Sequence, residues 1–179
     1  MSIVKTNKFQ TLAGATMNMP IQVVKTSLGD NLGTTSNDST NNYPSWVIGT
    51  NTTTWTDTTN LQLTITPRFA TSIIKLELSI VAGNGGANAA PAIRIIRGST
   101  IVWRPINNSV GPFSMLYSSG DIHGFPTVIC FDSPNTTSAV TYSLQYRTYS
   151  GNTTVGIFGW PYANHYAPLN TFVATEIAQ

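Results

Sequence analysis

The fold is decided by the stretch SAVTYSLQYRT, Ser138 to Thr148, in which apolar and polar side chains alternate without a break. Successive side chains of a β-strand point to opposite faces of a sheet, so this alternation predicts a half-buried strand. Its two faces are Val140, Tyr142, Leu144 and Tyr146 on the buried side, and Thr141, Ser143, Gln145 and Arg147 on the other. The pattern indicates an antiparallel β-sandwich and a protein that works through its surfaces.

Other segments repeat this period. Leu61–Thr66 alternates and stops at Pro67, and the next strand places Lys75, Glu77 and Ser79 opposite an inward row of Ile74, Leu76, Leu78 and Ile80. Gly83–Gly86 is predicted as a turn, and Gly98-Ser99 as a hairpin turn in which Gly supplies a positive φ. Further strands are predicted at Ile21–Thr26, Trp46–Ile48, Ala92–Arg97, Thr100–Arg104, Phe113–Tyr117, Phe125–Phe131, Thr153–Phe158 and Thr171–Ile177.

Regularly spaced strands without an amphipathic helix predict an all-β fold, an antiparallel jelly-roll β-sandwich of about 8–10 strands. We expect this domain to span residues 21–179, after an extended N-terminal arm at residues 1–20. The arm shows neither strand nor helix period, and a disordered terminus without a role is one interpretation. The other is docking on a partner or a neighbouring subunit, for which it carries suitable side chains. These are Lys5, Lys8, Phe9, Leu12, Met17 and Met19.

The composition favours a role in an assembly. Charged residues make up 9% of the chain, whereas Thr, Ser and Asn number 27, 16 and 16, which is 59 of 179 positions. A surface built from hydroxyls and amides has little charge repulsion to keep molecules apart. One explanation is that identical subunits or a larger assembly cover much of it.

Several function classes are disfavoured. The net charge of +2 comes from nine basic and seven acidic residues spread along the chain, without the dense basic stripe that nucleic acid requires. No apolar run is long enough to span a membrane, and no secretory signal opens the sequence, so we expect synthesis and folding in a cytoplasm. The single Cys130 lies in an apolar segment and is predicted to be a buried small hydrophobe.

The residues that support catalysis are few. Asp121 and His123 stand two apart and would share one strand face, but such a pair is more often a polar feature of a loop. His165 is too far along the chain to form a metal motif with His123. We therefore predict no enzymatic activity, no cofactor and no transition-metal site; a calcium ion held by single carboxylates stays an open alternative.

The segment from Trp160 to Pro168 is rich in aromatic side chains and contains two prolines. Three interpretations are open: a contact between subunits or with a capsid, a cover for the protein's own core, or a platform for a glycan. The candidate contact residues are Trp160, Tyr162, His165 and Tyr166.

The order of several segments resembles a family of virion proteins of tailed bacteriophages. The resemblance runs from Ile3–Gly14 and Ile21–Lys25, through Leu63–Ser72 and Phe131–Pro134, to Glu176–Ala178. The family includes capsid decoration proteins and tail-fibre tips, and its members are similar in build to trimeric jelly rolls of the tumour-necrosis-factor type. The chain has one compact domain and no long fibre shaft, which makes a separate fibre less favoured.

This resemblance implies a homotrimer on the virion surface that binds the major capsid protein or other virion proteins and stabilises the capsid shell. The alternative it implies is an adhesin of a tail fibre that recognises host surface glycans. Neither function involves nucleic acid or a membrane.

Overall fold

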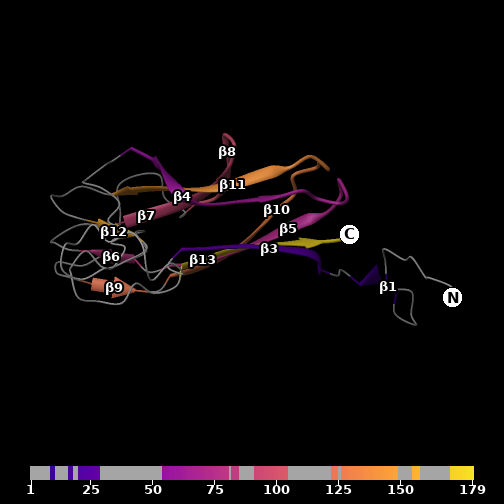
Figure 1. Cartoon of the computed structure of the whole chain (residues 1–179), viewed down its shortest axis with the longest axis horizontal. Helices are drawn as coiled ribbons and strands as arrows, with labels where there is room; N and C mark the ends of the chain where they lie inside the picture. Colours follow the sequence, from indigo (N-terminus) through magenta and orange to yellow (C-terminus); the bar gives the residue numbers. More distant parts are fainter. Residues whose placement is uncertain are drawn as a thin grey trace.

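The structure is a computed structural model that describes residues 9–10, 16–17, 20–28, 54–80, 82–84, 91–104, 122–124, 126–148, 155–157 and 170–179. Over these residues the chain forms antiparallel β-sheets and no helix. Two four-stranded sheets lie face to face as the two main layers (Figure 1). The predicted all-β class is therefore confirmed.

The first layer, the β5 sheet, has the strand order β10 (Thr127–Asp132), β5 (Ile73–Ser79), β13 (Asn170–Ile177) and β3 (Pro20–Leu28). All three pairings are antiparallel. Burial alternates along β5 and β13 with a period of two, as predicted. The inward row of Ile74, Leu76 and Leu78 is fully buried.

The second layer, the β11 sheet, has the strand order β4 (Thr56–Ile65), β11 (Val140–Thr148), β7 (Pro91–Arg97) and β8 (Thr100–Trp103). The faces predicted for β11 are confirmed, since Val140, Tyr142, Leu144 and Tyr146 are all buried. The β7–β8 hairpin is confirmed as well, because Gly98 has a φ of +57° and Arg97 pairs with Thr100 across the turn.

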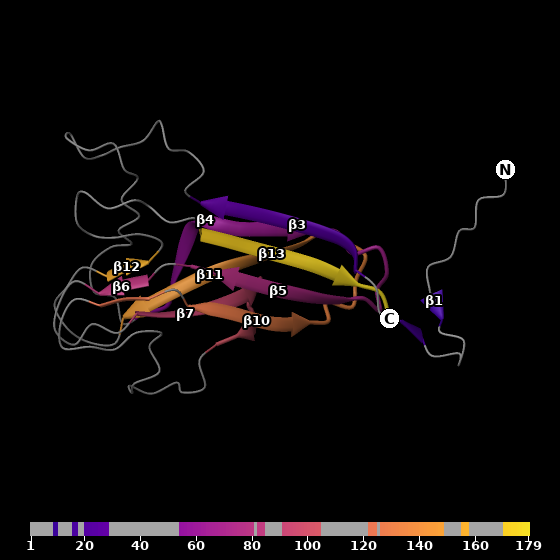
Figure 2. The same cartoon turned by 90° about the horizontal axis from the view of Figure 1, so that it is seen from below.

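The core lies between the two sheets and draws on six of their eight strands, while β3 and β8 pack the partly buried Val24, Val102 and Trp103 against it. Figure 2 shows the layers from a second direction, with β3 beside β4 at one edge. Burial of this apolar surface is the main stabilising term of such a fold. The buried cluster consists of Leu63, Ile65, Ile74, Leu76, Leu78, Ile80, Ile93, Ile95, Val128, Cys130, Val140, Tyr142, Leu144, Tyr146, Phe172 and Ala174.

A small third sheet extends the β5 sheet at one end. Its order is β12 (Val155–Ile157), β6 (Ala82–Asn84) and β9 (Ile122–Gly124). The pairing of β6 with β9 keeps the register of β5 with β10, and the Ile80 amide donates to the Pro126 carbonyl (3.2 Å) between the two ladders. The turn predicted at Gly83-Asn84 is wrong, because these two residues continue the ladder as a strand.

The N-terminal region contributes a short antiparallel pair, β1 (Phe9–Gln10) and β2 (Thr16–Met17). Figure 1 places β1 beyond the end of the sandwich at which the C-terminus lies. The strands predicted at Trp46–Ile48 and Phe113–Tyr117 lie outside the described residues, as do Gly85 and Gly86. The remaining predicted strands are confirmed, although β4 begins five residues before the predicted start at Leu61.

Candidate functional site

The structure brings together few of the predicted contact residues. Phe9 and Met17 are opposite each other in the β1–β2 pair. Lys5, Lys8, Leu12 and Met19 lie outside the described residues, and so do the four residues of the aromatic segment, Trp160, Tyr162, His165 and Tyr166. Their predicted roles therefore stay predictions, and the described surface directs attention to the two outer faces of the sandwich.

The outer face of the β5 sheet is apolar. Phe131, Ile129 and Val23 are 60, 55 and 62% exposed, although large hydrophobic side chains usually lie inside. The register places Phe131 and Val23 in one row across the sheet and Ile129 in the next row, which also contains Val173. We call this surface, with Phe131, Ile129, Val173 and Val23, the apolar face.

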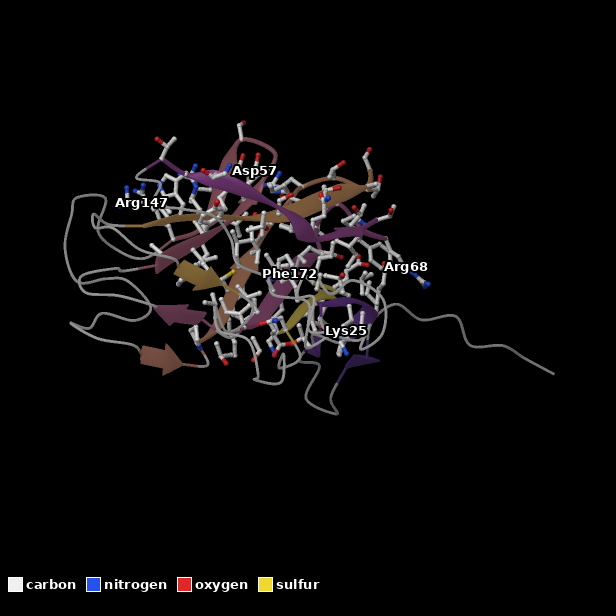
Figure 3. The ribbon with its side chains drawn as sticks, turned by 60° about the vertical axis from the view of Figure 1, so that its left-hand side comes forward. Lys25, Asp57, Arg68, Arg147 and Phe172 are labelled. Atoms are coloured by element: carbon white, nitrogen blue, oxygen red, sulfur yellow. The ribbon has the colours of Figure 1, made fainter. Side chains whose placement is uncertain are left out.

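The charges on the apolar face largely compensate one another. Lys75 Nζ lies 2.9 Å from Glu77 Oε1 on the central strand β5, which leaves the exposed Lys25 as an additional charge. Figure 3 shows Lys25 on this side of the molecule, across the sandwich from Asp57. A nearly neutral surface with several exposed apolar side chains is suited to burial against another protein.

A polar contact joins the two layers from the inward side of β10. Asp132 on β10 accepts hydrogen bonds from Arg97 Nε on β7 and from the Tyr142 hydroxyl on β11, each at 2.7 Å. The hydrogen bond to Asp132 raises the pKa of Arg97. Burial, with the hydrogen bond to Asp132 as a second cause, raises the pKa of Tyr142. The three groups fasten the β5 sheet to the β11 sheet, which is a structural role.

A second buried polar contact lies at the same end of the sandwich, because Asp132 and Glu176 are both register partners of Ile74. Glu176 is fully buried, and its Oε1 accepts hydrogen bonds from the Arg68 amide (2.7 Å), the Phe69 amide (3.3 Å) and the Ser72 hydroxyl (2.8 Å). With its amide nitrogen turned toward the carboxylate, Gln22 donates to Glu176 Oε2 at 3.2 Å. The carboxylate accepts hydrogen bonds from the polar groups of the turn between β4 and β5, so its role is to hold that turn in place.

The outer face of the β11 sheet is polar and positively charged. Asp57, Gln145 and Arg94 are paired across β4, β11 and β7. Arg94 Nε donates to Gln145 Oε1 (2.6 Å), and Gln145 Nε2 donates to Asp57 Oδ1 (2.7 Å). The guanidinium carbons of Arg94 and Arg147 lie 4.5 and 5.0 Å from the ring centre of Trp55.

Arg104, the residue after β8, adds a third guanidinium near Arg94. Burial lowers the pKa of Arg94, and the charges of Arg104 and Arg147 lower it further, whereas Asp57 acts in the opposite direction. We call Arg94, Arg147 and Arg104, together with the Trp55 ring that the first two contact, the cationic cluster. Figure 3 shows Asp57 and Arg147 on the same side of the sandwich, with Phe172 between the layers.

A bulge in β4 positions one side of the cationic cluster. Opposite β11, the register jumps between Gln62 and Asp57, so that Thr58 to Leu61 face the single residue Leu144. The buried Thr58 hydroxyl donates to the Leu144 carbonyl at 2.9 Å, which anchors the start of the bulge. Bulges commonly redirect side chains beside binding sites, and this one returns Trp55 and Asp57 to the sheet next to Arg147 and Gln145.

Groups suited to catalysis or metal binding do not gather in the described part of the chain. His123 lies on β9 opposite Gly83, and its candidate partner Asp121 lies outside the described residues. Within the described ranges, no three residues among His, Cys, Asp and Glu are placed to hold a metal ion. The same ranges contain no helix of the length and apolarity needed to cross a membrane.

Comparison with known proteins leaves the chain without an assigned relative. No known protein family matches the sequence, and no curated protein is similar to it.

The sequence analysis gave the outward rows of β5 and β11, but it missed the apolar face and the cationic cluster. The alternation that buries Val128 and Cys130 also turns Ile129 and Phe131 outward, and this signal was present in the segment. The cationic cluster depends on which strands are neighbours. Arg94, Arg104 and Arg147 come from three different strands or their ends, so their proximity follows from the sheet order and not from a local motif.

Proposed function

We propose that the protein is a structural protein of a phage virion surface, a homotrimeric capsid decoration protein that binds the capsid shell and stabilises it through buried surface. The observation that supports this proposal best is the apolar face. Phe131, Ile129 and Val23 are exposed on one sheet, and covering them with another protein would stabilise the complex by removing apolar surface from water. The resemblance of the sequence to virion proteins of tailed bacteriophages supplies the biological setting.

The strand order supports the jelly-roll part of the proposal. Eight strands form two four-stranded sheets, β3-β13-β5-β10 and β4-β11-β7-β8. Apart from the β7–β8 hairpin, each successive strand of the eight lies in the other sheet. An eight-stranded arrangement of two antiparallel sheets with such crossovers is typical of the jelly roll, a fold that occurs in viral capsid proteins.

The size of the apolar face indicates that it does not act alone. Four strands of seven residues cover roughly 19 by 23 Å, or about 440 Å², from the usual strand spacing and rise. A stable contact buries about 800 Å² on each partner. We therefore infer that a second surface contributes, and the arm at residues 1–20 is the candidate that the sequence offers.

The test is to make the apolar face polar. In Ile129→Thr/Phe131→Ser we expect the oligomer to dissociate, because the apolar area that drives association is replaced by hydroxyl groups. The melting temperature of the monomeric unit should change little, since both side chains point away from the core. Sedimentation velocity and capsid co-sedimentation measure the two effects.

Ile101→Thr is the matched control, because Ile101 is 39% exposed on the other sheet. This variant should associate as the unchanged protein does. An Ile129→Thr/Phe131→Ser protein that still forms the oligomer and binds capsids would contradict the proposed role of the apolar face.

The second candidate function is a tail-fibre adhesin that recognises host glycans. The cationic cluster favours it, because guanidinium groups on an exposed sheet face can bind acidic sugars. Electron cryomicroscopy of the virion separates the two candidates. Many copies on the capsid lattice would support decoration, and a few copies at the tail would support the adhesin.

A further inference from the structure

The register of the β5 sheet arranges the outward side chains of the apolar face in rows. Figure 2 looks onto this sheet and shows its four strands side by side. The first row consists of Phe131, Lys75, Thr175 and Val23, and the second of Ile129, Glu77, Val173 and Lys25. The two rows lie two residues apart along every strand, which is about 6.6 Å.

The first row complements the second. The edge strand β10 contributes an exposed apolar side chain to each row, and β5 contributes a cation to the first row and an anion to the second. Strand β13 contributes Thr and Val, which have similar shapes, and β3 contributes Val23 and Lys25, whose aliphatic stem can lie along apolar surface. A second copy of this face therefore fits the first when the two rows exchange places.

A two-fold axis that runs across the strands, midway between the two rows, makes this exchange. Face to face, Lys75 then lies opposite Glu77 of the partner subunit, and Phe131 lies opposite Ile129 of the partner subunit. Each pair occurs twice, as every contact about a two-fold axis does. Because Lys75 Nζ already lies 2.9 Å from Glu77 Oε1 within one chain, the four charges of the two β5 strands alternate in sign.

A two-fold axis parallel to the strands fits less well. It would place Lys75 opposite Thr175 of the partner subunit and Glu77 opposite Val173 of the partner subunit. Both charges would then lose water without gaining an opposite charge across the contact, which is costly. The register thus selects the axis that crosses the strands.

We propose that the apolar face binds the same face of a second copy of the chain, about a two-fold axis that crosses the strands between Phe131 and Ile129. This inference rests on the proposed function, in which the apolar face is a protein contact, and it names the partner. A two-fold contact closes on two copies and cannot build a trimer alone. In the proposed assembly it therefore joins copies that belong to neighbouring trimers.

The apolar side chains provide the affinity of this contact, and the charges provide its register. The face covers about 440 Å², so the pair hides about 880 Å² in total, below the roughly 1,200–2,000 Å² of a stable complex. Association is therefore weak in dilute solution and becomes strong where a shell holds copies close together. Lys75 and Glu77 contribute mainly to specificity, because the loss of water offsets much of their attraction.

The test exchanges the charges of Lys75 and Glu77 in the full chain. Lys75→Glu and Glu77→Lys each place two pairs of like charges in the contact, so either variant alone should associate at least about tenfold more weakly. An equal mixture of the two variants places opposite charges at both positions, so association should return. Sedimentation equilibrium over a wide concentration range measures the average mass of each sample.

This design separates the contact from the fold. Mixing leaves the like charges within each chain unchanged, so a restored mass cannot come from improved folding, and thermal melts check each variant. Lys75→Glu/Glu77→Lys in one chain should associate as the unchanged protein does. Arg68→Glu is the matched control, because it makes the same change in charge at an exposed residue of the turn between β4 and β5. It should keep its own association, and with Glu77→Lys it should add no more mass than the unchanged protein does.

Two results would overturn the two-fold contact: an unchanged protein whose mass does not rise with concentration, or a mixture that associates no better than its components. If Ile129→Thr/Phe131→Ser then still loses capsid binding, the apolar face binds a shell protein and the proposed function stands. The reverse result, a restored mixture with capsid binding unaffected in Ile129→Thr/Phe131→Ser, would keep the two-fold contact and contradict the proposed role of this face on the capsid.

Discussion

Cys130 shows how one buried position sets chemical reactivity. Its thiol is 9% exposed within the core, and burial, together with the charge of Asp132, raises its pKa from 9.0 to about 11. The thiolate is the reactive form, so a two-unit rise lowers the reactive fraction on the order of a hundredfold near neutral pH. We expect Cys130 to react correspondingly more slowly with a disulfide reagent at pH 8 in the folded protein than in urea.

The same shift predicts how stability depends on pH. A thiol whose pKa is higher in the folded than in the unfolded protein stabilises the fold fully below pH 9.0, and this contribution is lost as the pH rises to about 11. Urea unfolding between pH 8 and pH 11 measures the decline. Cys130→Ala should remove the part of this decline in the free energy of unfolding that Cys130 causes. A smaller decline of the same sign should remain, because the pKa of Tyr142 is also raised in the folded protein. Equal slopes in both proteins would contradict this assignment.

For single residues, the sequence predicts burial but not the partners that lie far away along the chain. The burial of Cys130 was predictable, because it lies in the continuous apolar run from Val128 to Phe131. Glu176 stands at an inward position of β13, in line with Phe172 and Ala174, and that placement was a readable anomaly. Its partners were not predictable, since Arg68, Phe69 and Ser72 lie more than a hundred residues away along the chain.

At the scale of the element, the bulge of β4 links fold stability to the cationic cluster. Thr58→Val replaces a hydroxyl with a methyl group of similar size and leaves the Leu144 carbonyl without its partner. We expect a loss of about 1–3 kcal/mol in the free energy of unfolding, as for other buried groups left unsatisfied.

Thr64→Val on the same strand is the control for this substitution. Its hydroxyl lies 2.7 Å from the Thr141 hydroxyl but is exposed, so water can replace the lost bond. Urea unfolding of both variants makes the comparison. An equal, small effect of Thr58→Val and Thr64→Val would show that the bulge does not depend on the buried hydrogen bond.

The strands illustrate why faces are easier to predict than sites. Alternation gives the buried and exposed sides of β5, β11 and β13 from local sequence alone, and the structure confirms them. The row of Asp57, Gln145 and Arg94 requires the register of three strands, which long-range pairing determines. The bulge shifts that register further, so the cluster could not have been located from the pattern of each strand.

For the whole molecule, the two outer faces differ in chemistry. The β5 sheet presents Phe131, Ile129 and Val23, whereas the β11 sheet presents arginines, Gln145 and Asp57. A sandwich that exposes both faces to water would gain from polar residues on each. The asymmetry therefore favours an orientation in which the apolar face turns toward protein and the cationic cluster turns toward solvent.

In this orientation, the N-terminal arm is the second contact surface that we propose, and truncation tests that role. Residues 1–19 precede Pro20, where β3 begins its pairing with Ile177 of β13, so their removal leaves both four-stranded sheets and the buried cluster complete. We expect the truncated protein to fold with a nearly unchanged melting temperature. Co-sedimentation with capsids stripped of the protein should fall strongly, because the apolar face alone supplies about half the area of a standard contact. Truncated protein that binds capsids as tightly as the full chain would show that the arm is not the missing contact surface.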